Sequence, residues 1–247
     1  MKQFILLISL LICLDGLGQD NSTHLRYTFI KAKEGGNYRE NLLEKFAKLH
    51  KQRIEDGIIE GWDVWEVVNA RQTPFSHVVV TLMDISKMDS LYSGVNMQKV
   101  FPYMTDSDLA EFYKSNIESR DIIGDYMVTN IKSASKTGIF IDEFMTMNFM
   151  MVKEGKFKTY ETMEINLVKE GLPQGDLRSG WNLQKRVDKY GTNLDWNYLT
   201  LDWYAKYSDF INHVSAPAMD ADKDHQAMMA VRDLRESVTL RLIKMVR

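Results

Sequence analysis

The sequence predicts an α+β fold built from two tandem βαββαβ repeats, and three observations support this prediction. Segments of the first half recur in the same order about 120 residues later. Each half carries the two-residue periodicity of four strands and the 3.6-residue periodicity of two helices. The strands are apolar on both faces, so the sheet face that the helices leave bare also needs cover. We therefore expect the two repeats to pack sheet against sheet.

Four pairs of matching segments show the duplication. They are residues 29–35 with 149–155, 61–62 with 180–181, 77–81 with 197–201, and 120–121 with 235–236. The junction falls near residues 133–142, so we expect one repeat over residues 24–132 and the other over residues 143–247. Each repeat enters its second strand through a Gly-Trp pair, where we expect the glycine to allow a close turn and the tryptophan to fill the core.

Periodicity places the same six elements in each repeat. In the first repeat we predict strands over residues 27–33, 62–68, 77–83 and 122–131, and helices over residues 38–56 and 107–119. In the second repeat we predict strands over residues 144–153, 181–187, 198–204 and 237–246, and helices over residues 159–170 and 220–234. Asn37 is the predicted N-cap of the first helix, and Gly57 is its predicted end. A βαββαβ unit forms a four-stranded antiparallel sheet with both helices on one face.

The N-terminus has the pattern of a secretory signal. Lys2 precedes an apolar run over residues 4–14, and small residues follow before Gln19. We therefore expect residues 1–19 to be a signal peptide that is cleaved near Gln19, giving an exported protein, periplasmic or extracellular. Lipid attachment at Cys13 remains an alternative to ordinary cleavage. No later apolar run is long enough to predict a transmembrane anchor.

Composition narrows the classes of function. The formal net charge is −3, which does not favour nucleic acid as a partner. Cys13 is the only cysteine, so disulfides and thiolate chemistry are not expected in the mature chain. The acidic run at residues 220–224 lacks the glycine and the final acid of a calcium loop, and the methionines of residues 145–151 fit core packing better than copper binding. We predict no metal site, and the sequence does not indicate an oligomeric state.

The pattern resembles a known superfamily, the dimeric α+β barrel (ferredoxin-like) proteins in tandem-repeat form, including antibiotic-biosynthesis-monooxygenase-like and NIPSNAP-like groups. The resemblance depends on the βαββαβ plan, on Leu49-His50, Arg53-Ile54, Gly57 and Gly61-Trp62, and on the aromatic segment 196–198. It implies that the two sheets close into a pseudo-dimeric α+β barrel within one chain. It also implies that a ligand, a haem or an oxygenase substrate could lie between sheet and helices.

The residues that such a site would need are divided between the two halves. The haem-degrading group would call for Asn, Trp and His in one half, and neither half offers all three in equivalent core elements. His50, beside the apolar stripe of the first helix, is a candidate axial ligand or proton carrier, although a histidine at the edge of the core explains it as well. His77 begins a strand where the second repeat has Asn197, which fits a hydrogen-bonding role.

These features lead to one preferred hypothesis of function and one alternative. We expect a non-catalytic barrel that binds a small apolar or aromatic ligand or serves a purely structural role, because all five tryptophans fall near the second and third strands of the repeats. The candidate ligand-binding residues are Trp62, Trp65, Trp181, Trp196, Trp203 and His77. The alternative is a monooxygenase-like enzyme, either cofactor-independent or haem-using, with His50 as its catalytic residue.

Overall fold

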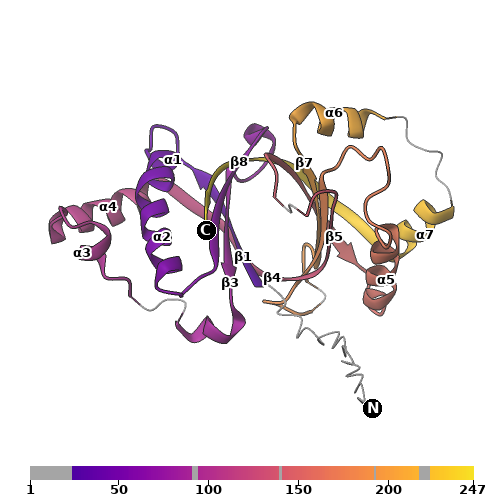
Figure 1. Ribbon diagram of the computed structural model, residues 1–247, viewed down its shortest axis with the longest axis horizontal. Helices are drawn as coiled ribbons and strands as arrows, with labels where there is room; N and C mark the ends of the chain where they lie inside the picture. Colours follow the sequence, from indigo (N-terminus) through magenta and orange to yellow (C-terminus); the bar gives the residue numbers. More distant parts are fainter. Residues whose placement is uncertain (1–23, 91–93, 139–140, 192, 217–222) are drawn as a thin grey trace, which may run out of the picture.

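The computed structural model describes residues 24–90, 94–138, 141–191, 193–216 and 223–247. Its described part is a closed eight-stranded barrel with a layer of helices on each of two opposite sides (Figure 1). The predicted signal peptide, with Cys13, lies outside the described residues, so export and lipidation stay predictions. No helix in the described ranges is long and apolar enough to cross a membrane.

The first repeat supplies four strands and the helices on one side of the barrel. Its elements are β1 (His24–Ala32), α1 (Tyr38–Asn41), the π-helical turn η1 (Leu42–Phe46), α2 (Ala47–Glu55), β2 (Gly61–Val67), the 3-10 turn η2 (Ala70–Gln72), β3 (His77–Met83), the 3-10 turn η3 (Ile85–Ser90), α3 (Met97–Val100), α4 (Asp106–Glu118) and β4 (Arg120–Ser135). The predicted helix over residues 38–56 is therefore one continuous helical segment, α1–η1–α2, with a π-helical turn inside it.

The second repeat supplies the other four strands and the helices on the opposite side. Its elements are β5 (Phe144–Val152), α5 (Phe157–Leu167), β6 (Gly180–Arg186), β7 (Tyr198–Tyr204), α6 (Tyr207–Ser215), α7 (Lys223–Val231) and β8 (Arg232–Val246). The predicted helix over residues 220–234 runs too far, because the chain is already extended from Arg232. Helix α6 was not predicted.

The strands follow the order β1-β3-β2-β8-β5-β7-β6-β4, and β4 closes the barrel on β1. All pairs are antiparallel, and the two repeats meet at the β2–β8 and β4–β6 pairs. Strand β4 is longer than predicted because it belongs to both sheets: residues 120–129 pair with β1 and residues 128–135 pair with β6. Strand β8 does the same with β5 and β2. The expectation that each repeat covers the other is confirmed.

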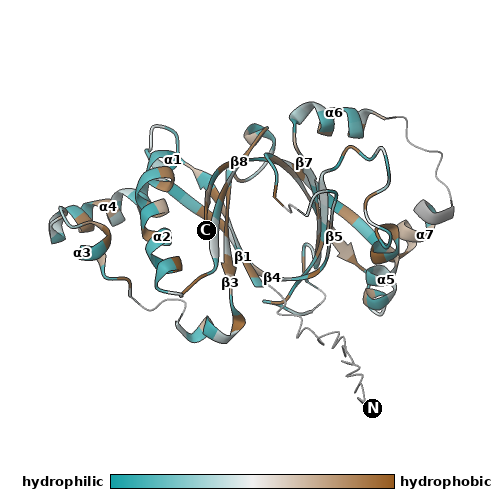
Figure 2. Ribbon diagram, in the orientation of Figure 1, coloured by the Kyte–Doolittle hydropathy of each residue, from teal (hydrophilic) through white to brown (hydrophobic). Residues whose placement is uncertain are grey.

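The barrel interior is one hydrophobic core built by both repeats. Its buried residues come from the inward faces of the strands and include Phe29, Val78, Met147, Leu199 and Val238. Hydrophobic residues, brown in Figure 2, alternate with hydrophilic ones along the strands and helices, as expected for elements that bury one face. Two further cores fill the spaces between the sheets and their helices, one in each repeat.

Local sequence signals explain where several helices and strands begin or end, but the predicted cap of the first helix is wrong. Gly35 and Gly155 occupy equivalent turns and share a φ of 74°, which favours glycine. Helix α4 begins with a capping box between Thr105 and Asp108. Asn37 was predicted to cap the first helix, but its side chain makes no cap bond. Its Oδ1 instead accepts hydrogen bonds from side chains on the neighbouring helical segments, and so links α1 to α4.

Candidate active site

A cavity of about 210 Å³ lies between the sheet of the first repeat and its helices. The lining side chains come from strands β1 to β4 and from the helical segments α1, η1, α2 and α4, which lie together on one side of the barrel (Figure 1). They are Arg26, Thr28, Ile30, Tyr38, Leu42, Phe46, His50, Arg53, Trp62, Val79, Thr81, Asn116, Arg120 and Ile122. The cavity is therefore polar and cationic in part, and apolar in part.

The two-residue period of a strand and the 3.6-residue period of a helix explain why these side chains share one cavity. On β1, alternate residues Arg26, Thr28 and Ile30 line the cavity, whereas the residues between them face the barrel. On the helix, Leu42, Phe46, His50 and Arg53 recur at the spacing of one helical face. The π-helical turn spans the first two of these helical positions. Such turns occur often at functional sites because they re-aim the side chains that follow.

His50 is held in a stack of aromatic rings. Its imidazole centroid lies 4.6 Å from the Trp62 ring centroid, at an interplanar angle of 18°. The Phe46 ring centroid lies 6.3 Å from that of the imidazole, at an interplanar angle of 27°. Arg53 donates from Nη1 to Nδ1 of His50 at 3.3 Å. Arginine can only donate, so Nδ1 must be the unprotonated nitrogen, and the neutral ring carries its proton on Nε2.

Charge and burial keep His50 neutral. Burial, and then the positive charge of Arg53, lower the pKa of His50 from 6.5 to about 3. The imidazole therefore stays uncharged at physiological pH. Its remaining polar function toward the cavity is that of a hydrogen-bond donor through Nε2–H.

Three arginines line the cavity. The charge of Arg26 is compensated by a bidentate ion pair with Asp125, in which Nε donates at 2.8 Å to Oδ1 and at 3.0 Å to Oδ2. Arg53 and Arg120 supply the positive charge of the cavity. Arg120 donates from Nε to Asn116 Oδ1 at 3.3 Å. No carboxylate occurs among the described residues that line the cavity. A site with arginines and a neutral N–H donor suits a small ligand that carries an anionic oxygen.

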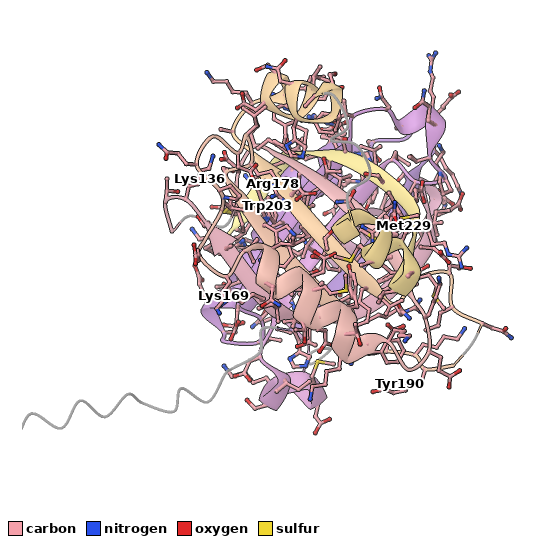
Figure 3. All side chains as sticks on the ribbon, turned by 90° about the vertical axis from the view of Figure 1, so that its right-hand side faces the viewer. Lys136, Lys169, Arg178, Tyr190, Trp203 and Met229 are labelled. Atoms are coloured by element: carbon pink, nitrogen blue, oxygen red, sulfur yellow. The ribbon has the colours of Figure 1, made fainter. Side chains whose placement is uncertain are left out.

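The space between the sheet and the helices of the second repeat is arranged differently. A cavity of about 540 Å³ lies at its edge beside Phe157 and Tyr198, and no histidine occurs among the described residues that line it. Tyr160, Val168, Trp181, Met228 and Val231 form one buried cluster between its sheet and its helices. Figure 3, seen from this side, shows α5 and α7 together in front of the sheet. The two repeats share a plan, but the cavity with a histidine belongs to the first.

Comparisons with known proteins place the fold. No family model and no curated protein matches the sequence. Solved structures do match over most of the chain. A candidate monooxygenase from Fusobacterium nucleatum aligns with a TM-score of 0.54 at 12% identity, covering 92% of this chain and 94% of that one. The fold is that of the dimeric α+β barrel superfamily.

Two further α+β barrels show the same likeness. An anthrone oxidase-like protein aligns with a TM-score of 0.55 at 13% identity, covering 92% of this chain and 93% of that one. A candidate chlorite dismutase aligns with a TM-score of 0.52 at 7% identity, covering 91% and 96% of the two chains. At these identities the likeness demonstrates the fold alone.

The names of these α+β barrels correct one expectation from the sequence. We expected a non-catalytic protein, but the similar structures are named as a monooxygenase, an oxidase-like protein and a chlorite dismutase, which are enzyme names. This comparison contradicts the non-catalytic hypothesis, and the enzyme alternative becomes the proposal that the site has to support. The sequence carries no contiguous catalytic motif because this cavity is assembled from residues on four strands, on the helical segment α1–η1–α2 and on α4.

The residues of the cavity do not fit a haem held by His50. A histidine that ligates iron through Nε2 needs a free lone pair there, and its Nδ1–H normally donates to an acceptor. In this α+β barrel Nδ1 faces the Arg53 donor, so Nε2 carries the proton. The cavity of about 210 Å³ is also smaller than the range of roughly 300–1,000 Å³ typical of pockets for larger ligands.

The structure separates the five tryptophans into distinct places. Trp62 lies at the cavity, and Trp181 lies in the core of the second repeat. Trp65 and Trp203 meet inside the barrel with ring centroids 5.4 Å apart. Trp196 packs at the far end of the barrel, edge-on against two other aromatic rings. A single site among all five, as expected from the sequence, does not exist.

His77 is buried at the start of β3 and lies outside the cavity lining. Its Nδ1 is 2.9 Å from Ser76 Oγ, and its Nε2 is 3.9 Å from a Glu66 carboxylate oxygen. Burial lowers the pKa of His77. At the equivalent position Asn197 bonds both backbone groups of Val152. Asn197 therefore ties two backbone segments directly, whereas the His77 ring contacts the side chains of Ser76 and Glu66. His77 and His50 are not brought together.

Sequence reasoning missed most of the polar residues of the cavity. Arg53 could have been found, because it follows His50 by three positions on a predicted helix and so shares its face. Tyr38 could also have been found, because it precedes Leu42 by four positions on the same predicted helix. Arg26 precedes the predicted strand 27–33 by one residue, so neither its face nor its partners were predicted. Arg120 comes from β4 and carries no local signal of a shared site.

Proposed function

We propose that the protein is a monooxygenase-like enzyme that works without a haem bound to His50, and that its active site is the cavity of the first repeat. The half-buried, neutral His50, fixed by Arg53 and stacked on Trp62, carries this proposal. The enzyme names of the similar α+β barrels support the reaction class. They do not identify a substrate.

The charges of the cavity favour a substrate that binds as an anion. His50 offers Nε2–H, and the arginines supply positive charge around it. Preformed donors of this kind stabilise an oxyanion without reorganisation. An enolate or phenolate oxygen held there would keep the substrate in its electron-rich form, which is the form that reacts with O₂.

The cavity does not supply an obvious base. Nδ1 of His50 already accepts from Arg53, and burial raises the pKa of Tyr38 so that the phenol keeps its proton. Among the described lining residues, none is therefore a free base at neutral pH. The substrate must lose its proton in solution or to water, so it is acidic: an enolisable ketone or a phenol with a low pKa.

The size of the cavity limits the substrate to a compact molecule. A cavity of roughly 150 Å³ can enclose a benzene ring. At about 210 Å³, this one suits one ring or two small fused rings with oxygen substituents. An overall reaction that needs no external reductant converts a CH₂ group and O₂ into C=O and H₂O.

Oxygen uptake tests the proposal. We expect purified protein to consume O₂ with 1,3-indanedione, a compact acidic ketone, faster than buffer alone, with anthrone as a larger comparison. His50→Ala removes the N–H donor and should lower the rate by about a hundredfold. His50→Gln keeps an N–H donor and should retain more activity. The rate should rise with pH along the ionisation of the substrate, without a step near pH 6.5.

The matched control is Lys48→Ala, an exposed residue on the same helix, which should leave the rate unchanged. Equal O₂ uptake by the His50→Ala protein and the unchanged protein would contradict the proposal. So would the absence of protein-dependent uptake with both compounds.

A further inference from the structure

The barrel interior contains a second cavity, of about 310 Å³, at the end where β2 and β6 begin. It is separate from the cavity of the first repeat, since the sheet lies between them. The opposite end of the barrel has a cavity of about 360 Å³ with aromatic walls, among them Phe29, Phe149 and Trp196. The two ends differ in their polar lining, and the end where β2 and β6 begin has a buried carboxylate.

Asp63 is the acidic residue of this interior cavity. It is the one carboxylate among the described residues that line it, and its side chain is 3% exposed. Most polar neighbours are already paired with each other. Tyr27 donates from its hydroxyl to Gln184 Oε1 at 2.9 Å, and Trp203 donates from its indole to Asn182 Oδ1. The carboxylate of Asp63 is thus the charge that a molecule in the cavity would meet.

The partner of Asp63 lies at the rim. Arg247 donates from Nη1 and Nη2 to the two carboxylate oxygens, at 2.7 and 2.8 Å. Its side chain is 36% exposed. It passes over Gly61, where an added Cβ would lie 2.7 Å from Nη1. Each carboxylate oxygen has a second lone pair, so this arginine does not exhaust the capacity of Asp63.

The walls of the cavity suit a cation with an apolar body. Trp65 and Trp203 both line it, with ring centroids 5.4 Å apart and planes inclined at 57°. Indole rings attract cations more strongly than other aromatic side chains do. A buried carboxylate beside two indoles selects positive charge, and the volume restricts the ligand to a small molecule.

We propose that this end of the barrel interior binds a small organic cation, an amine or a quaternary ammonium ion with an apolar body. Its charged group pairs with Asp63 in competition with Arg247. Its apolar part packs against Trp65 and Trp203. The site is independent of the function proposed for the first-repeat cavity.

Calorimetric titration with two matched probes tests the site. Phenethylammonium carries a positive charge, and 2-phenylethanol has nearly the same shape without it. We expect the cation to bind at least about tenfold more tightly than the alcohol. Asp63→Asn should remove that preference. Glu118→Gln, an exposed acid on α4, should keep it.

A second variant keeps the test decisive if Asp63→Asn does not fold. Arg247→Met removes the competing guanidinium and leaves Asp63 unpaired, so phenethylammonium should bind this variant more tightly than the unchanged protein and should raise its melting temperature more. Equal affinities for phenethylammonium and 2-phenylethanol, in the unchanged protein and in Arg247→Met, would overturn the proposal. So would an Asp63→Asn protein that folds and keeps the preference.

Discussion

The two repeats have the same strands and the same Gly-Trp entrance, yet they use the space under their helices differently. In the first repeat this space keeps a cavity beside His50 and Trp62. In the second repeat Tyr160 and Met228 pack with Trp181 into a buried cluster, and the cavity of about 540 Å³ beside it has no histidine among its described lining residues. The comparison teaches that the scaffold itself does not make a site. A few side chains on the helices and strands decide what each space offers to a ligand.

Each space also holds ionisable groups whose charged form is disfavoured by burial, and one group from each repeat allows a comparison. In the first repeat, burial lowers the pKa of His50. In the second repeat, burial raises the pKa of Glu164, which lies on α5. Desolvation therefore favours the neutral form of both groups. Only His50 lines a cavity in which its neutral form can meet a ligand.

The largest expected effect comes from creating a cavity in the buried cluster of the second repeat. Tyr160→Ala removes a side chain that is 0% exposed, and it should lower the free energy of unfolding by about 3–5 kcal/mol. Urea denaturation measures this change. Tyr190, which is 84% exposed, is the control, and Tyr190→Ala should stay within about 0.5 kcal/mol. If both substitutions cost the same, the second repeat is not packed as tightly as its buried cluster indicates.

The next largest expected effect is a pH dependence of the free energy of unfolding, caused by His50 in the first repeat. Because the pKa of His50 is about 3 in the folded protein and near 6.5 in the unfolded chain, the unfolded chain binds the proton first as pH falls. His50 should therefore lower the free energy of unfolding by up to about 1.4 kcal/mol for each unit that the pH falls between 6.5 and 3. Above pH 6.5 it should have no such effect.

Denaturation of the unchanged protein and of His50→Gln at pH 7, 5.5 and 4 measures this dependence. The unchanged protein should lose stability more steeply on acidification than the variant, since His77 is common to both. Parallel curves would show that His50 is not held neutral by its surroundings.

The smallest expected effect concerns close packing at the strand entrance of the second repeat. A Cβ on Gly180 would lie 3.1 Å from Cδ1 of Trp203, whose indole is held by Asn182. Gly180→Ala should therefore destabilise the protein by about 1 kcal/mol. Gly94 has open space around it, and Gly94→Ala is the control. Thermal unfolding compares them, and equal melting temperatures would argue against a tight contact at Gly180.

The sequence predicted the strands best where local pattern and pairing coincide. The bounds of β3 and β7 agree with the predictions, since turn residues limit two compact runs of apolar residues. Strand β4 was predicted too short because residues 132–135 pair with β6 of the other repeat, and periodicity along one segment does not report a distant partner. Strand β8 was predicted to begin too late, because residues 232–234 were predicted to be helical, whereas they pair with β5 of their own repeat. Helix α6 was missed because it is short and none of its residues is buried.

The candidate active site was predictable only in fragments. His50 was identified as a candidate from its position beside an apolar stripe, and Trp62 from its place in a repeated motif. Their stacking could not be foreseen, because His50 and Trp62 are twelve residues apart and meet only when α2 packs on β2. The protonation state of His50 depends on Arg53 in the same helix, so this part was within reach of the sequence. The presence of Arg26 and Arg120 in the site could not be predicted without knowing that β1 and β4 pair in the sheet.

The pairing of β8 with β2 has a consequence for biosynthesis. Strand β8, Arg232–Val246, is synthesised after the other seven strands of the barrel. It supplies the neighbour of Gly61–Val67 and completes the wall on which the first repeat depends. Until β8 has been made, the apolar inner face of the first four strands has no permanent cover, and such surfaces aggregate readily. The nascent chain must therefore remain protected until this strand is in place.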